Sequence, residues 1–207
     1  MVMSGYIEQM DTVVIDVLKE IGNIGAGNAA TALAKMINKK VDMNVPKVNV
    51  LDFAEVPELL GGAENQVCGI FFKIEGDIDG SIMFVLNIED ALALVSLLMP
   101  RDDNTLDEFT FSALKEIGNI LSGSYISSLS GLTNLNIKIS IPSIAVDMAG
   151  AVLSVPAIEF GQVSDKILII ENEFIELQED DSVRGFFFLV PDLDSYDTLF
   201  GSLGIQI

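Results

Sequence analysis

Hydrophobic and polar positions follow helical and strand periods that come in the same order in the two halves of the chain. Each half predicts a long helix, an extended strand, a short helical or irregular connection, a two-stranded hairpin and a short closing helix. In the first half these elements fall at 11–37, 41–51, 54–61, 66–75, 80–87 and 89–98. In the second half they fall at 107–130, 135–147, 149–155, 163–175, 183–190 and 192–202. The pattern predicts an α+β fold in which one architecture occurs twice.

The two halves also share sequence. The seven residues Leu18–Ile24 return unchanged as Leu114–Ile120, at an offset of 96 residues. The strand pattern after each copy reaches a proline at the same offset, Pro46 in the first half and Pro142 in the second. Self-similarity of this kind indicates an internal duplication.

The two repeats, about 1–100 and 104–207, are joined by the short acidic stretch 100–104. Thr105 and Glu108 have the spacing of a capping box, which predicts the start of the second long helix. Because the linker is short, we expect the repeats to pack in pseudo-twofold symmetry as one domain. In that domain two long helices pack on the merged strands of an antiparallel sheet.

The repeated helix carries a polar face. At 100° per residue, Asp16, Glu20 and Asn23 fall within an arc of about 60°, opposite the apolar stripe. Ser112, Glu116 and Asn119 form the matching arc of the second helix. On the next turn of each face lies a glycine, Gly27 or Gly123, which leaves room for a partner to approach the helix backbone.

A single Glu-x-x-Asn on an amphipathic helix is usually an ordinary solvated pair. Here a Gly-Asn pair, predicted to be exposed in mid-helix, occurs in both repeats at Gly22-Asn23 and Gly118-Asn119. Both residue types disfavour helix relative to Ala, by roughly 0.5 to 1 kcal/mol each. The repetition therefore favours a functional use of the polar face, although duplication alone can preserve such a string passively.

The composition limits the chemistry that these faces can perform. With 31 Asp and Glu against 11 Lys and Arg, the formal net charge is −20, which disfavours nucleic-acid binding. There is no His, which excludes Ser-His-Asp, Cys-His and His-based zinc sites, and Cys68 is the single cysteine. No apolar run reaches 18 residues, so we expect no membrane insertion and a cytoplasmic location.

An exposed carboxylate and carboxamide without a nucleophile can supply positioning. The amide can accept a hydrogen bond from a water molecule and donate one to an anionic oxygen, which places that water relative to a phosphoryl group. The carboxylate can pair with a cation of a partner. Such a site requires a substrate that is already reactive, and an aspartyl phosphate on another protein meets this requirement.

These positions follow a longer pattern: an Asp or Ser, three residues, a Glu, two residues, an Asn, then 22 residues and a Pro. The pattern occurs twice, with both spacings intact, at Asp16, Glu20, Asn23 and Pro46 and at Ser112, Glu116, Asn119 and Pro142. On these residues the chain resembles the CheC type of the CheC/CheX/FliY family of chemotaxis phosphatases.

The resemblance implies that the chain dephosphorylates the chemotaxis response regulator CheY in its phosphorylated form. Asn23 and Asn119 would orient the attacking water, and Glu20 and Glu116 would pair with the regulator's active-site lysine. The regulator would hold the Mg²⁺, so no cofactor or metal of the chain's own is expected. The other motif positions are expected to support the site: Asp16, Pro46, Ser112 and Pro142.

The family implies a second partner, the receptor deamidase CheD. The repeats differ in the segment that follows the first strand, which is 52–58 in one repeat and 148–154 in the other. Residues 148–154 are small and nearly uncharged. We expect this segment to dock CheD, with Asp147 and Met148 as candidate contacts. Simple burial of the segment between the repeats explains its composition equally well.

A rival interpretation comes from another class of function. The chain would then be a non-catalytic adaptor that binds the phosphorylated regulator or sequesters CheD. Both interpretations predict binding to the regulator, and they differ in turnover.

Overall fold

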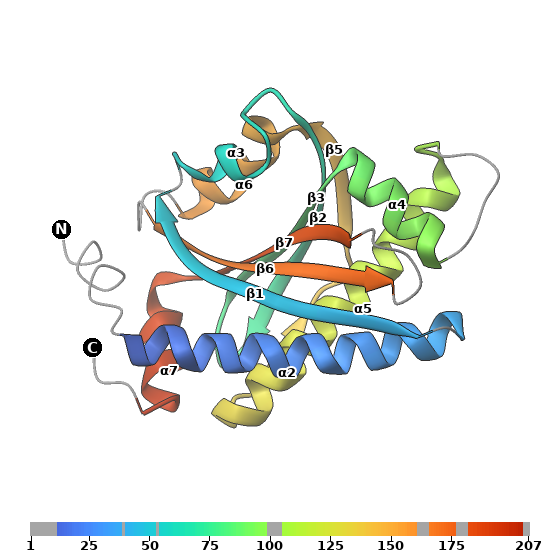
Figure 1. The fold of residues 1–207 in the computed structure, drawn as a ribbon. Coiled ribbons are helices and arrows are strands. Elements are labelled where there is room, and N and C mark those ends of the chain that lie inside the picture. The colour runs from blue at the N-terminus through green and yellow to red at the C-terminus, as the bar shows by residue number, and fades with distance from the viewer. Residues whose placement is uncertain are drawn as a thin grey trace.

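The fold is described by a computed structural model that covers residues 12–38, 40–52, 54–98, 105–160, 166–176 and 182–204 (Figure 1). The helices are α2 (Thr12–Ile37), α3 (Val56–Leu59), α4 (Ile88–Leu98), α5 (Glu108–Thr133), α6 (Ala149–Phe160) and α7 (Leu193–Ser202). The strands are β1 (Val41–Asp52), β2 (Gln66–Gly76), β3 (Gly80–Asn87), β4 (Ile137–Ile139), β5 (Ser143–Met148), β6 (Lys166–Glu176) and β7 (Ser182–Pro191). The predicted series of elements is thereby confirmed in both halves. The predicted linker at 100–104 lies outside the described residues.

The described strands form one antiparallel sheet in the order β1-β6-β7-β3-β2-β4, and β5 also pairs with β2. Each half contributes one hairpin, β2-β3 or β6-β7. The outer strand β1 of the first half pairs with β6 of the second, whereas β4 and β5 of the second half pair with β2 of the first. The halves therefore exchange outer strands, and the merged antiparallel sheet predicted from the sequence is present.

The register at the centre of the sheet has the symmetry expected of two repeats. Met83 of β3 pairs with Phe188 of β7, which is its own equivalent at an offset of 105 residues. Ser81 pairs with Val190, and their equivalents in the other repeat, Phe186 and Val85, pair with each other as well. We infer from this register that the chain is one domain of two repeats, 1–100 and 104–207, related by a pseudo-twofold axis through the β3-β7 ladder.

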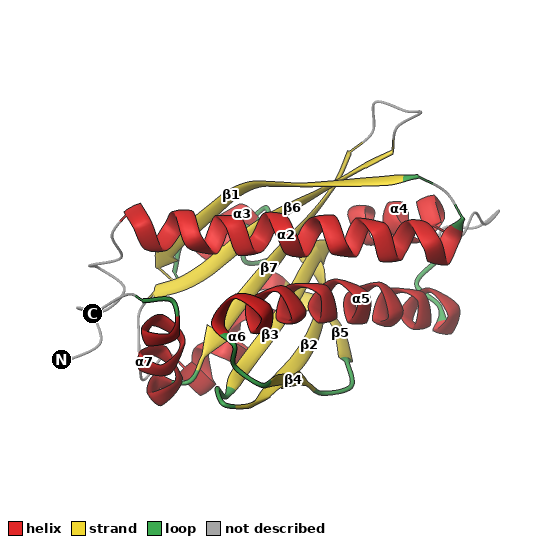
Figure 2. Cartoon of the chain, turned by 90° about the horizontal axis from the view of Figure 1, so that it is seen from below, coloured by secondary structure: helices red, strands yellow, loops and turns green. Residues whose placement is uncertain are grey.

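Helices cover both faces of the sheet (Figure 2). The long helices α2 and α5, with α4 and α7, share one buried cluster with the strands, and α3 and α6 share a second cluster on the opposite face. Along β7 the period of 2 sends Phe187 to the α2-α5 face and its neighbours Phe186 and Phe188 to the α3-α6 face. This double burial explains why three consecutive phenylalanines are all core residues.

The start of α5 differs from the prediction. The residue before the first turn is Asp107 rather than Thr105, and its Oδ1 accepts a hydrogen bond of 2.8 Å from the backbone N–H of Thr110. Thr105 instead accepts a 2.7 Å hydrogen bond at its carbonyl from the Thr110 hydroxyl. The capping box on Thr105 and Glu108 was therefore wrong, because the Asp107 carboxylate lies within hydrogen-bond reach of a backbone N–H of the first turn.

Two other boundaries also differ. The strand expected at 135–147 is broken into β4 and β5, and Pro142, which has no N–H to donate to a ladder, lies in the break. The helix expected to end at residue 155 continues to Phe160, because the residue before a proline, here Val155, is only disfavoured and not forbidden in the α conformation.

Candidate functional site

The polar faces predicted on the long helices are exposed to solvent. On α2, Asp16, Glu20 and Asn23 are exposed, while Leu18 and Ile21 are buried on the opposite side against the sheet. The separation follows from the helical period, since one turn of α2 carries both a residue that the sheet covers and one that it leaves to solvent.

The second face has the same arrangement on α5. Ser112, Glu116 and Asn119 are exposed. Leu114 and Ile117, which lie between them in the sequence, are buried on the other side of the helix. The Ser112 hydroxyl donates a 2.8 Å hydrogen bond to the carbonyl of Glu108 one turn earlier. The Ser112 hydroxyl is therefore bonded to its own helix, as is common for serine in a helix.

Gly118, the glycine before the motif Asn of α5, has a packing role that the sequence pattern did not indicate. Gly118 is buried, and a Cβ at this position would lie 3.0 Å from Cγ2 of Ile70 on β2. Its repeat equivalent Gly22 is buried as well. The prediction that the Gly-Asn pairs are exposed was thus wrong for the glycines, because the helix must approach the sheet closely there. Only the exposed Asn of each pair lacks a packing explanation.

The long helices cross in opposite directions (Figure 1). At the crossing, a Cβ on Gly25 would lie 2.7 Å from Cδ1 and 3.1 Å from Cα of Tyr125, and Asn28 Nδ2 donates a 3.4 Å hydrogen bond to Ser128 Oγ. In each helix the motif lies on the N-terminal side of this crossing. Because the helices are antiparallel, the two motif segments point to opposite ends of the pair, and the chain has two separate candidate sites.

Gly27 and Gly123 lie one turn beyond the motif asparagines. A Cβ added at either position would meet no heavy atom of the described residues within 4 Å. The described part of the fold therefore does not require glycine there, and the open space lies beside each Glu-Asn pair. This open space supports the sequence prediction that a partner approaches the backbone at these points.

Two glycine variants test whether the helix crossing requires glycine for packing. Gly25→Ala is expected to lower the free energy of unfolding by about 1 to 3 kcal/mol, because the added methyl overlaps Tyr125 at the helix crossing. Gly27→Ala, the matched control two residues away, is expected to keep or raise stability by up to about 1 kcal/mol through helix propensity. Urea denaturation followed by circular dichroism measures both. Equal losses for the two variants would contradict the crossing geometry.

One motif proline lies within a strand and the other between two strands, in each case beside a motif helix. Pro46 is within β1, at a register shift between Asn44 and Lys47, and β1 lies against α2. Pro142 lies between β4 and β5, both of which contact α5. Each proline therefore coincides with an irregularity of a strand that neighbours a candidate site.

Asp147 and Met148 lie at the end of β5, immediately before α6, and both are exposed. The Asp147 carboxylate accepts a 2.8 Å hydrogen bond from the N–H of Met148. The segment that follows is mixed: Ala149, Val152 and Leu153 are buried against the sheet, whereas residue 151 is exposed. The structure thus buries one side of this segment and leaves another side accessible.

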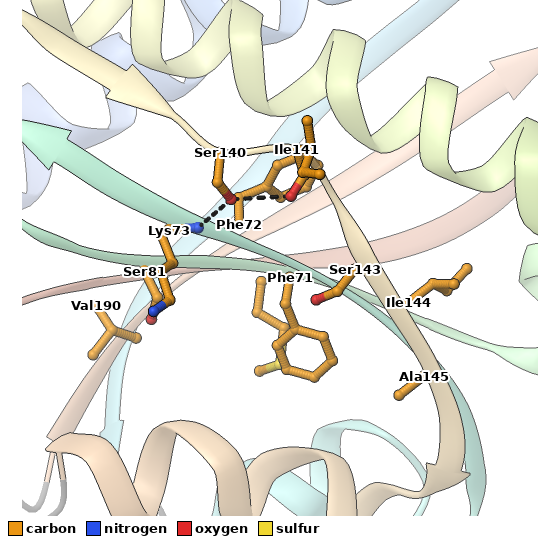
Figure 3. Close-up of a pocket in the computed structure, with 11 residues that line it drawn as sticks. Phe71, Phe72, Lys73, Ser81, Ser140, Ile141, Ser143, Ile144, Ala145 and Val190 are labelled. Atoms are coloured by element: carbon orange, nitrogen blue, oxygen red, sulfur yellow. Dashed lines mark hydrogen bonds between the residues drawn. The ribbon is translucent and has the colours of Figure 1, made fainter.

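A groove of about 620 Å³ opens on the opposite face of the sheet from the motif helices, where α3 and α6 leave the strands uncovered (Figure 3). Phe71, Met83 and Val190 form its apolar surface, with Lys73 paired across the strands with Ser81. The described residues that line the groove include none of the motif residues. The candidate sites are therefore exposed helix surfaces that lie apart from this groove.

Among the described residues, neither a reactive thiol nor a metal-binding cluster is present. Cys68 is fully buried, and burial raises the pKa of its thiol to about 12, so it is not a nucleophile at neutral pH. Among the described residues no group of His, Cys, Asp and Glu side chains is arranged to hold a metal ion. In the same part of the chain, no helix combines the length and the apolar character that crossing a membrane requires.

Comparison with known proteins agrees with the motif. Residues 13–50 match the CheC-like family, and residues 67–158 match the chemotaxis phosphatase CheX family. The chain is 36% identical to the CheY-P phosphatase CheC of Bacillus subtilis (strain 168) over 198 residues, which cover 93% of this chain and 95% of that protein. It is 33% identical over 133 residues to the flagellar motor switch phosphatase FliY of the same organism, covering 62% of this chain and 34% of FliY.

Solved structures share the fold. Thermotoga maritima FliY superimposes with a TM-score of 0.74 at 22% identity, over 95% of this chain and 98% of that chain. The FliM middle domain from H. pylori has a TM-score of 0.66 at 12% identity, over 93% and 99% of the two chains. These likenesses establish the fold, while the extent and identity of the sequence match establish the relationship. The chain therefore belongs to the CheC family of chemotaxis phosphatases.

Proposed function

We propose that this chain hydrolyses the aspartyl phosphate of a CheY-type response regulator, with one catalytic site on α2 and a second on α5. The observation that carries the proposal is the exposed Glu-Asn pair that occurs at the same place on both helices. The identity to a CheY-P phosphatase over nearly the whole chain supports the choice of substrate. The buried cysteine and the absence of His leave positioning as the available chemistry.

In each site the Asn positions the attacking water. Its amide oxygen accepts a hydrogen bond from the water, and its amide nitrogen donates one to a phosphoryl oxygen of the regulator. The catalytic asparagines are Asn23 and Asn119. Both project from mid-helix positions, so the water is held without the entropic cost of ordering a loop.

The Glu of each site binds the regulator and fixes its position on the helix. Glu20 or Glu116 pairs with the active-site lysine of the regulator, since a carboxylate and an ammonium form a charge-assisted hydrogen bond. The Mg²⁺ of the reaction belongs to the regulator, and this chain needs no cofactor of its own. Asp16, Ser112, Pro46 and Pro142 support the helix and strand segments from which these groups project.

The demand on such a site is modest. An aspartyl phosphate hydrolyses spontaneously, and placing one water molecule correctly is expected to accelerate its decay by about 10² to 10³, equivalent to about 3 to 4 kcal/mol of barrier. Two positioned side chains are sufficient for an effect of this size.

The experiment that tests the proposal follows the decay of a phosphorylated CheY-type receiver after the phosphodonor is removed. Substoichiometric amounts of this protein should accelerate the decay, with each molecule acting on many receivers. Saturable kinetics with turnover support an enzyme. A receiver lifetime that stays unchanged although the proteins bind each other contradicts it.

The second candidate function is a non-catalytic adaptor for the phosphorylated regulator or for CheD. The observation behind it is the fold, which this chain shares with the FliM middle domain. One fold can host different functions, so this fold is compatible with binding alone. The adaptor predicts the same docking faces on α2 and α5 but no turnover, so the decay experiment separates the two.

We further propose that CheD docks at the start of α6, with Asp147 and Met148 as contacts. Their exposure, 53% for the Met148 side chain, supports this assignment. The charge-reversing variant Asp147→Lys is expected to weaken CheD binding at least tenfold, measured by calorimetry, while leaving receiver dephosphorylation unchanged. Unchanged CheD affinity would contradict docking at this point. Since the proposed receiver partner is a cytoplasmic signalling protein, we place this chain in the cytoplasm.

A further inference from the structure

We propose that Phe109 is an apolar anchor for the phosphorylated receiver at the α5 site, and that it makes this site bind the receiver more tightly than the α2 site. This inference rests on the proposed function, because it assigns the receiver to the face that carries Glu116 and Asn119. It predicts a difference in receiver affinity between two sites that have the same motif Glu and Asn.

The position of Phe109 on the helix carries the argument. It lies seven residues before Glu116, which is two turns or about 10 Å along the axis and about 20° around it. Phe109, Glu116 and Ile120 therefore form one row on α5, beside the row that contains Asn119. A receiver that reaches Glu116 and Asn119 from solvent extends naturally over the first turn of the helix, where Phe109 lies.

Much of this ring lies outside the core. The Phe109 side chain is 47% exposed, whereas the phenylalanines at the centre of the sheet, Phe84 and Phe187, are at most 2% exposed. A single exposed apolar residue is common and needs no explanation. Here, however, the ring is continuous with the exposed face that carries Glu116 and Asn119, and aromatic side chains are enriched at the centre of protein interfaces.

The first repeat lacks this ring. At the offset of 96 residues the equivalent of Phe109 is Val13, and a valine carries much less apolar area than a phenylalanine. The motif Glu and Asn are shared, and an isoleucine follows the Asn in both repeats, as Ile24 and Ile120; the polar pair Asp16 and Ser112 adds no apolar area to either face. The difference in apolar area between the two faces therefore lies at the first turn, and it predicts a lower KM for the α5 site with a similar kcat.

The test isolates each site before the ring is removed. In Asn23→Ala protein only the α5 site acts, and adding Phe109→Ala should raise the KM for the phosphorylated receiver about tenfold with kcat unchanged within twofold. In Asn119→Ala protein, where only the α2 site acts, Phe109→Ala should change neither constant. Phe109→Leu should restore part of the affinity, because it keeps apolar area at the same place.

Leu132 supplies the matched control. It lies on the same helix and is 49% exposed, but it is about 160° around the axis from Glu116. Leu132→Ala in the Asn23→Ala background should leave KM unchanged. The anchor is contradicted if Phe109→Ala has no effect on KM there, if it lowers kcat instead, or if Leu132→Ala produces the same change.

A binding measurement separates failure of this inference from failure of the proposed function. The dissociation constant of a receiver loaded with beryllofluoride, a stable mimic of the phosphoryl group, is measured with a Glu20→Lys/Asn23→Ala protein, whose α2 face can no longer pair with the regulator's lysine, and with its Phe109→Ala derivative. About tenfold weaker binding in the derivative supports the anchor even if the chain proves to be an adaptor without turnover. Equal affinities overturn the anchor even if the wild-type protein is an active phosphatase.

Discussion

The double variant Asn23→Ala/Asn119→Ala is expected to leave the lifetime of a phosphorylated receiver the same as without the protein, a loss of the whole acceleration of about 10² to 10³. Both asparagines are exposed on the outer faces of long helices, so their truncation removes the proposed water-positioning amides without disturbing the core. Each single variant should retain the activity of the remaining site. Because the sites lie on opposite sides of the helix crossing, the two partial activities should add up to the wild-type rate.

The matched control is Asn28→Ala. Asn28 is also an exposed asparagine of α2, but it faces the second helix and donates to Ser128 rather than to the open face. This variant should retain the wild-type rate. Circular dichroism and urea denaturation verify that all four variants are folded. A double variant that still accelerates decay as the wild type does would rule out the water-positioning role of these residues.

Phe187→Ala is expected to lower the free energy of unfolding by about 3 to 5 kcal/mol, because it removes a ring at the point where both long helices meet the sheet. The side chain is 2% exposed, and its ring stacks on that of Tyr125 with centroids 4.5 Å apart. Leu18 of α2 and Ile126 of α5 line the same small internal space as Phe187. The substitution would leave a cavity that residues of two helices and two strands cannot all collapse to fill.

Phe109→Ala, the same chemical change at a half-exposed position, should cost less than about 1 kcal/mol in the same urea titration. For a domain whose total stability is of the order of 5 to 15 kcal/mol, the Phe187 variant would lose at least about a fifth of that stability. Similar losses for the two variants would contradict the placement of Phe187 at the centre of the core.

Local patterns determined much of this protein. The order of helices and strands, the two repeats and the exposed polar faces on α2 and α5 follow from periods of 3.6 and 2 residues, which act over a few neighbouring positions. The motif residues Glu20, Asn23, Glu116 and Asn119 are for the same reason placed on the solvent side as predicted. This exposure is what the roles proposed for them require, because each side chain has to reach into another protein.

Only the tertiary structure decided the features that depend on contacts between distant segments. The pairing of β7 with β3, the exchange of outer strands and the close approach of Gly25 to Tyr125 join residues that are far apart in the sequence, from 61 positions for Gly76 and Ile137 to 135 for Val41 and Glu176. No local period encodes which of several similar strands become neighbours. Contacts in the folded chain decided two further features. Asp107 rather than Thr105 caps α5, and Gly118 is buried against Ile70. The physical reason is that a short polar or apolar pattern specifies the face of an element, whereas the partner of that face is selected by packing across the whole chain.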